Sequence, residues 1–115
     1  MNDRTQLLKG TLEGCILKVI QNEETYGYEI SERLKAVGFP AVSEGTIYPL
    51  LLRLERNGLL TPTYRESPSG PRRKYYRLTE LGMQALREFY HQWRQLVACM
   101  DRLFADGGRE TNDHL

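Results

Sequence analysis

The residues that follow Thr79 carry an apolar stripe longer than a chain of this size can bury by itself. Between Thr79 and Ala105, apolar side chains recur at the spacing of one face of an α-helix. They are Ala85, Leu86, Phe89, Trp93, Leu96, Val97, Met100, Leu103 and Phe104. Such a helix spans about 40 Å, whereas 115 residues provide one domain with one modest core. We therefore expect two copies of the chain to pair through this helix as a homodimer.

The first half of the chain predicts three short helices. Apolar residues recur with helical spacing over residues 5–21 and again over residues 26–37. Ser43 is placed to cap a third helix, which carries its own buried stripe. Pro49 lies within that third segment and removes one backbone hydrogen bond. Either the helix begins near Thr46 or its first turn is distorted.

A β-hairpin follows the three helices. Residues 59–66 and 73–78 are rich in Thr, Tyr and Leu, and they flank a Ser-Pro-Ser-Gly-Pro turn. The order of three helices, a hairpin and one long helix is that of a winged helix-turn-helix. We therefore expect a mainly α fold with a small β-hairpin and a long C-terminal dimerisation helix.

The tip and the returning strand of the hairpin are locally basic, although the whole chain has a net charge of only +1. They hold Arg72, Arg73, Lys74 and Arg77 around Tyr75 and Tyr76, without an acid. Beside a DNA-reading helix, such cations contact phosphates or the minor groove, and Tyr75 can donate to a phosphate. Because strand side chains alternate, either Arg72 and Lys74 face DNA while Arg73 faces away, or the reverse; one tyrosine packs in the core. The alternative is a solvated strand whose charges prevent aggregation.

The start of the third helix carries the side chains expected to meet DNA bases. They are Ser43, Gly45, Thr46 and Tyr48, although Ser43 also suits a cap and Tyr48 could instead pack on the hairpin. Arg53, further along the helix, is expected to contact a phosphate or an acidic neighbour such as Glu55. Tyr28 begins the second helix, where it can donate a hydrogen bond to a phosphate, whereas Tyr26 is expected in the core.

Four stretches together resemble the PadR family of bacterial transcriptional regulators. They read LLKGTLEGCILKVI, TYGYEISERL, SEGTIYPLLLRLERNGLL and GPRRKYYRLTELG, and the resemblance runs from about Leu7 to Gly82. It implies a homodimer with an N-terminal winged helix that mostly represses transcription and in many cases releases DNA when a small molecule binds. Because it is short and has a single long C-terminal helix, the chain resembles the small subfamily of these regulators. Two recognition helices related by a two-fold axis read a pseudo-palindromic operator in double-stranded DNA.

The same resemblance implies a ligand site around Trp93. In small members of the family, two such tryptophans face a cavity between the subunits and sandwich planar aromatic compounds. Phe89 and Val97 would share that face, and the first helix, from Leu7 to Lys18, could supply the other wall. The alternative role for Trp93 is that of an ordinary residue of the dimer core.

These interpretations divide the chain into three parts. Residues 1–78 form a winged-helix DNA-binding domain, residues 79–105 a dimerisation helix, and residues 106–115 a disordered tail. The chain contains no apolar run that could span a membrane and no secretory signal at its start, so we expect a cytoplasmic protein.

No enzyme chemistry is indicated by the sequence. His91, His114, Cys15 and Cys99 lack metal-ligand spacing, and no nucleophile–base pair or phosphate-binding glycine loop is present. We expect no cofactor, and we expect the two cysteines to be small buried hydrophobes rather than a disulfide. The alternative function is a winged-helix module for protein–protein contact without specific DNA binding, which the near-neutral charge favours.

Overall fold

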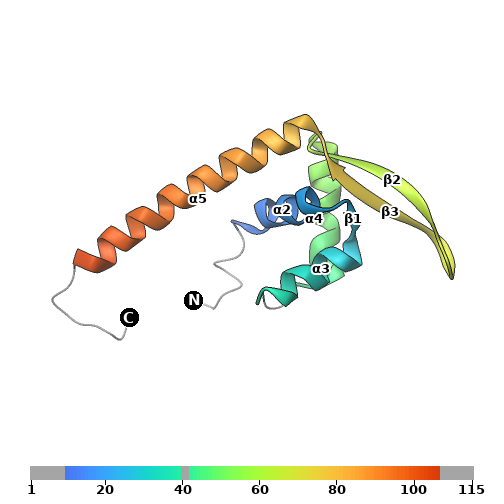
Figure 1. Ribbon diagram of the computed structural model, residues 1–115, viewed down its shortest axis with the longest axis horizontal. Helices are drawn as coiled ribbons and strands as arrows, with labels where there is room; N and C mark the ends of the chain where they lie inside the picture. The colour runs from blue at the N-terminus through green and yellow to red at the C-terminus, as the bar shows by residue number, and fades with distance from the viewer. Residues whose placement is uncertain (1–9, 40–41, 107–115) are drawn as a thin grey trace.

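The computed structural model describes residues 10–39 and 42–106 and places three helices between a β-hairpin and a long helix. The elements are α2 (Leu12–Asn22), β1 (Thr25–Tyr26), α3 (Gly27–Ala36), α4 (Glu44–Arg56), β2 (Leu60–Ser67), β3 (Gly70–Leu78) and α5 (Glu80–Asp106). Figure 1 shows the hairpin and the far half of α5 extending in opposite directions from α2, α3 and α4. The expected winged helix with a long C-terminal helix is confirmed.

Helix α4 begins at Glu44 and tolerates a proline within it. The Ser43 hydroxyl accepts a hydrogen bond from the Thr46 backbone N–H at 3.3 Å, so Ser43 is the expected N-cap. Pro49 therefore lies inside the helix, and it has no N–H to donate to the Gly45 carbonyl. The helix nevertheless continues to Arg56, which answers the question that the sequence left open: it does not begin near Thr46.

The sheet contains a third strand that sequence analysis missed. Strand β1 has only two residues and pairs antiparallel with β3, so that Thr25 lies opposite Tyr76 and Tyr26 opposite Tyr75. The sheet order is β1-β3-β2. The prediction of helix from Tyr26 was wrong at this end, because Tyr26 is extended and α3 begins at Gly27. Two residues are too few to show the alternation by which strands are recognised.

The hairpin is longer than predicted. Strand β2 runs to Ser67 and β3 begins at Gly70, so the turn is confined to Pro68 and Ser69. Arg72 therefore lies within a paired strand and not in a loop. Arg73, Lys74 and Arg77 are held at fixed positions on a ladder of paired residues, whereas Arg72 lies at an irregularity of the register near the tip.

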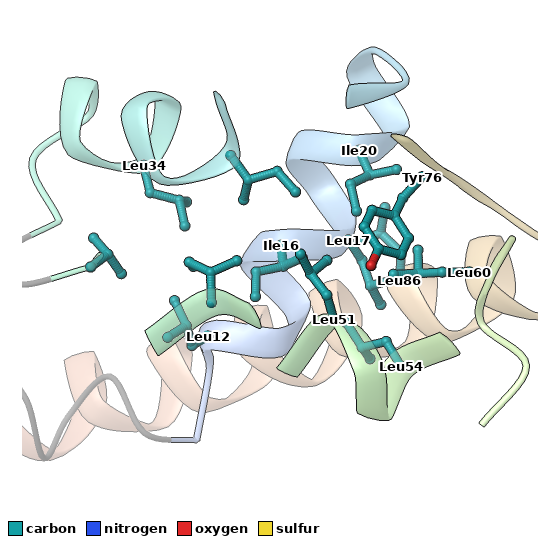
Figure 2. Packing of buried hydrophobic residues seen from close by; sticks show 13 residues of the cluster. Leu12, Ile16, Leu17, Ile20, Leu34, Leu51, Leu54, Leu60, Tyr76 and Leu86 are labelled. Atoms are coloured by element: carbon teal, nitrogen blue, oxygen red, sulfur yellow. The ribbon is translucent and has the colours of Figure 1, made fainter. Parts of the chain in front are cut away.

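One hydrophobic core joins all of the helices to the sheet. It contains Leu12, Ile16, Leu17, Ile20, Ile30, Leu34, Val42, Ile47, Leu51, Leu54, Leu60, Tyr76 and Leu86. Figure 2 shows Tyr76 entering this cluster from the sheet, beside Ile20 and Leu60. Tyr76 is 1% exposed, so it is the tyrosine that the sequence placed in the core, whereas Tyr26 is only half-buried.

The start of α5 is anchored on this core. Thr79 caps the helix, because its hydroxyl accepts a hydrogen bond from the Gly82 N–H at 3.0 Å. A side chain at Gly82 would collide with the backbone carbonyl of Leu59. A Cβ at Gly14 of α2 would lie 2.5 Å from ring atoms of Phe89. These two glycines therefore let α5 approach the hairpin and α2 closely.

The far half of α5 keeps its apolar side chains exposed within the part of the chain that the structure describes. Leu96, Met100, Leu103 and Phe104 are between 46% and 67% exposed, although they continue the apolar stripe. In Figure 1 this part of the helix extends beyond α2 and α3. The stripe therefore extends past the domain core, as its length in the sequence predicted.

Several other expectations differ from the structure or fall outside it. Gly10 and Thr11 form a turn, so the first helix begins at Leu12, while residues 5–9 lie outside the described residues. Asp106 still belongs to α5, and the predicted tail at residues 107–115 also lies outside them. Cys15 is half-buried and burial raises the pKa of its thiol. Cys99 is exposed, so the expectation that it is buried was wrong for the single chain.

Within the described residues, no helix is both long enough and apolar enough to cross a membrane.

Candidate nucleic-acid interface

The first turns of α3 and α4 meet at one exposed surface. A Cβ at Gly27, the first residue of α3, would lie 4.0 Å from the Glu44 carboxylate at the start of α4. Tyr28 and Tyr48 are 53% and 50% exposed at this place. Ser43, Gly45 and Thr46 are exposed beside them. The structure thus brings the two helix starts together and leaves exposed all five residues that the sequence singled out there.

The hairpin has two chemically different faces, because residues opposite each other in an antiparallel pair point to the same side. Tyr64 lies opposite Lys74, on the inner face that also carries Tyr76 into the core. Arg65 lies opposite Arg73, on the outer face. The Arg72 guanidinium lies 5.4 Å from the Tyr64 ring centroid, which places Arg72 with Lys74 on the inner face. Of the two arrangements left open by the sequence, the α4 side carries Arg72 and Lys74, and Arg73 faces away.

Lys74 is held by an acid of α4. Its Nζ lies 2.9 Å from Oε1 of Glu55, and the two side chains are 21% and 29% exposed. Burial alone lowers the pKa of Lys74, but its hydrogen bond to Glu55 and the nearby Tyr76 outweigh burial, so the pKa is raised. Lys74 therefore stays charged, ties the hairpin to α4, and has its charge balanced within the chain.

The outer face is a stack of cations and aromatic rings. The Arg65 guanidinium lies 4.1 Å from the Tyr75 ring centroid, and Tyr75 lies 5.0 Å from Tyr26. The Arg73 guanidinium lies 4.7 Å from the Tyr26 ring and donates to its hydroxyl at 3.3 Å. Arg65 also pairs with Glu24 at 2.8 Å. This stack orders the middle of the hairpin on the side away from α4.

Arg53 of α4 makes a contact that the sequence did not show. Its Nε lies 3.1 Å from Oε2 of Glu13 on α2, whereas the acidic neighbour suggested by the sequence was Glu55. Glu55 instead pairs with Lys74. A contact between two helices that are far apart in the chain leaves no local pattern from which it could have been found.

These ion pairs explain how a basic surface coexists with a net charge of +1. Lys74, Arg53 and Arg65 each have a carboxylate partner, so much of the positive charge is balanced inside the protein. Among the residues that the structure describes, Arg72 and Arg73 form no ion pair. Arg77, near the base of the hairpin, also has no ion pair among the described residues, so two of the three unpaired hairpin cations lie towards the tip.

A groove of about 1460 Å³ opens between α2, the end of α3 and α5. Gly14 and Cys15 of α2, Leu34 and Val37 of α3, and Phe89 and Trp93 of α5 are among the residues that line it. Trp93 is 41% exposed. Val97 is half-buried and does not line the groove. The first helix forms a wall, as the sequence suggested, and the wall from α3 was not foreseen.

Within residues 10–39 and 42–106, no three His, Cys, Asp or Glu side chains lie close enough together to hold a metal ion. His91 is exposed on α5, and His114 lies outside the described residues.

Comparison with known proteins gives a consistent result. Residues 16–88 match the sequence profile described as the transcriptional regulator PadR-like family. A PadR-like transcriptional regulator from Bacillus cereus is 48% identical, with a TM-score of 0.79 over 86% of this chain and 96% of that chain. A PadR family regulator from Eggerthella lenta is 37% identical, with a TM-score of 0.79 over 94% of this chain and 89% of that chain.

A third structure, Bacillus subtilis PadR, was solved in complex with operator DNA. It is 27% identical to this chain and has a TM-score of 0.65. The similarity covers 72% of this chain and 48% of that longer protein.

Proposed function

This chain belongs to the PadR-like family of transcriptional regulators, and from that membership we propose that it is a sequence-specific DNA-binding repressor that acts as a homodimer. The observation that carries the proposal is the exposed surface at the starts of α3 and α4, beside a hairpin whose Arg72 and Arg73 have no acidic partner among the described residues. A planar aromatic compound that binds near Trp93 would release the DNA.

In this proposal α4 enters the major groove of the operator. Its exposed first turns bring Ser43, Gly45, Thr46 and Tyr48 to the base edges. The hydroxyl of Tyr28 donates to a backbone phosphate beside the start of α3.

The hairpin supplies phosphate contacts next to the recognition helix. Arg72 shares the inner face with Lys74, so its long side chain reaches a phosphate on the α4 side. Lys74 forms an ion pair with Glu55 and so fixes the hairpin against α4. Its ammonium group, held in that pair, adds a positive charge closer to the protein than that of Arg72. Tyr75 and Arg73 lie in the outer stack, from which Arg73 can reach a flanking phosphate only by leaving the Tyr26 ring.

The homodimer forms through the exposed stripe of α5. Leu96, Met100, Leu103 and Phe104 lie beyond the core of their own chain, and burial against a second copy removes their apolar surface from water. Residues 79–105 then act as a dimerisation helix that spaces two DNA-binding domains, residues 1–78.

Selection from a pool of random duplexes tests the DNA-binding function. We expect the recovered sequences to share an inverted repeat whose half-sites lie about one helical turn apart, because a two-fold dimer presents two α4 helices. Recovery of sequences without a shared motif would contradict sequence-specific binding. Recovery of a single half-site would contradict the dimer.

The proposed ligand site combines the groove with the dimer. Phe89 and Trp93 line the groove, and Val97 follows Trp93 by one turn on the same helix, where the second copy would cover it. Stacking on Trp93 suits planar aromatic compounds of many kinds. Such a compound releases DNA only if it binds the DNA-incompetent dimer more tightly than the competent one.

A Trp93→Ala dimer should bind a planar aromatic probe about tenfold more weakly, since two stacking faces are lost. Titration of anilinonaphthalene sulfonate, followed by its own fluorescence, measures this loss. Gln95→Ala lies on the opposite side of α5 and serves as the control. A Trp93→Ala dimer that keeps full probe affinity and full ligand-dependent release of DNA would remove Trp93 from the ligand site.

A further inference from the structure

The contact between Glu13 and Arg53 leaves one edge of the arginine available. Only Nε of the guanidinium lies against Glu13, at 3.1 Å from Oε2. No ion pair or hydrogen bond joins its two terminal amino groups to any other residue that the structure describes. The Arg53 side chain is 59% exposed, whereas that of Glu13 is 33% exposed. The acid therefore lies behind the arginine, and the free edge of the guanidinium is open to solvent.

The surroundings of Glu13 make it a firm support. It lies on α2, whose next residue, Gly14, is packed closely against the Phe89 ring. The Oε2 atom of Glu13 is shielded from solvent and accepts no hydrogen bond from the described residues, so its tie to Arg53 is an ion pair. The acid is therefore fixed by a packed helix, while Arg53 belongs to the helix proposed to enter the DNA groove.

We propose that Glu13 is a positioning residue for Arg53 in DNA binding, an inference that rests on the proposed function. Glu13 holds Nε, and the two terminal amino groups of Arg53 then meet a phosphate that flanks the major groove. That pair of donors matches two phosphate oxygens. A free arginine loses much rotamer freedom when it binds, and the contact with Glu13 removes part of that loss in advance.

The negative charge of Glu13 also repels the phosphate, so the two effects have opposite signs. Glu13→Gln keeps the size of the side chain and a polar oxygen beside Nε but removes the charge. Glu13→Ala removes all three. Comparison of these two variants therefore separates the positioning effect from the repulsion.

A double-mutant cycle tests the proposal on the full-length chain, with a selected operator duplex. We expect Glu13→Ala to bind about fivefold more weakly and Arg53→Ala about tenfold more weakly. The Arg53→Ala dimer should also show a salt slope shallower by about 2, one phosphate for each subunit. In the Arg53→Ala background, Glu13→Ala should not weaken binding further, and the loss of its repulsion should tighten binding slightly. Glu13→Gln should bind at least as tightly as the wild type.

The control is an ion pair at the end of α2. Glu23, the C-cap of α2, pairs with Arg33 at 2.8 Å, and neither residue is proposed to contact DNA, so Glu23→Ala should leave operator affinity unchanged. Thermal unfolding of every variant identifies those that lose affinity through loss of the fold.

Three results would overturn the inference. Glu13→Ala could bind as tightly as the wild type, which would mean that Arg53 needs no support. It could weaken binding equally with and without Arg53, which would assign its effect to the packing of α2. If the wild type itself shows no preference for the operator over a scrambled duplex, the proposed function fails, and this inference fails with it.

Discussion

Replacing Leu96 with Asp should convert the dimer to monomers and weaken binding to a two-half-site operator by at least about 100-fold. Leu96 is 50% exposed in the middle of the unpartnered stripe, where a second copy would bury it. A buried carboxylate without a partner opposes association strongly. Once the two DNA-binding domains are separate, the second half-site no longer benefits from the high effective concentration that linkage provides.

Analytical ultracentrifugation and an operator titration measure the two parts of this effect. Gln95→Asp is the matched control, because it adds the same charge next to Leu96 but outside the apolar stripe of α5. We expect the control to remain dimeric. A Leu96→Asp chain that stays dimeric and binds normally would show that the stripe of α5 is not the dimer interface.

Replacing both Arg72 and Arg73 with Ala should weaken operator binding by about 100-fold at low salt and make its salt dependence shallower. Each phosphate contact contributes about 0.9 to the slope of log affinity against log salt, and a dimer carries two copies of each arginine. Arg72 lies on the α4 side of the hairpin, whereas Arg73 is stacked on Tyr26. We therefore expect Arg72→Ala alone to account for most of the change.

Arg77→Ala provides the control for that experiment, because Arg77 is an exposed cation of the same strand near the base of the hairpin. Arg77→Ala should change the slope of log affinity against log salt much less than the Arg72/Arg73 double variant does. An unchanged affinity and slope in the Arg72/Arg73 double variant would mean that the hairpin is not a DNA element. The alternative of a module for protein–protein contact would then be the better account of a chain with so many of its cations paired.

Much of the fold could be predicted from local signals. The three short helices and α5 follow from the spacing of apolar residues, and the caps Ser43 and Thr79 mark where two of them begin. The hairpin follows from a Ser/Pro/Gly turn between two Tyr- and Thr-rich segments. These signals lie within a few residues of the structure that they specify, so a single sequence contains them.

The features that were missed depend on contacts between distant parts of the chain. Strand β1 exists only because Thr25 and Tyr26 pair with β3. The acid partner of Arg53 comes from α2, and the acid partner of Lys74 comes from α4. No periodicity records which acid a cation will meet after folding. For the same reason, the sequence predicted a basic hairpin but not which of its charges are already balanced.

One titration decides whether this chain is a DNA-binding regulator. The purified dimer is added to a labelled duplex from upstream of its own coding region, and to a scrambled duplex of equal composition, between about 50 and about 200 mM salt. We predict tight binding to the first duplex, weak binding to the second, and a loss of affinity as salt increases. Equal and weak binding to both duplexes, together with failure to select any motif from the random pool, would contradict a sequence-specific repressor.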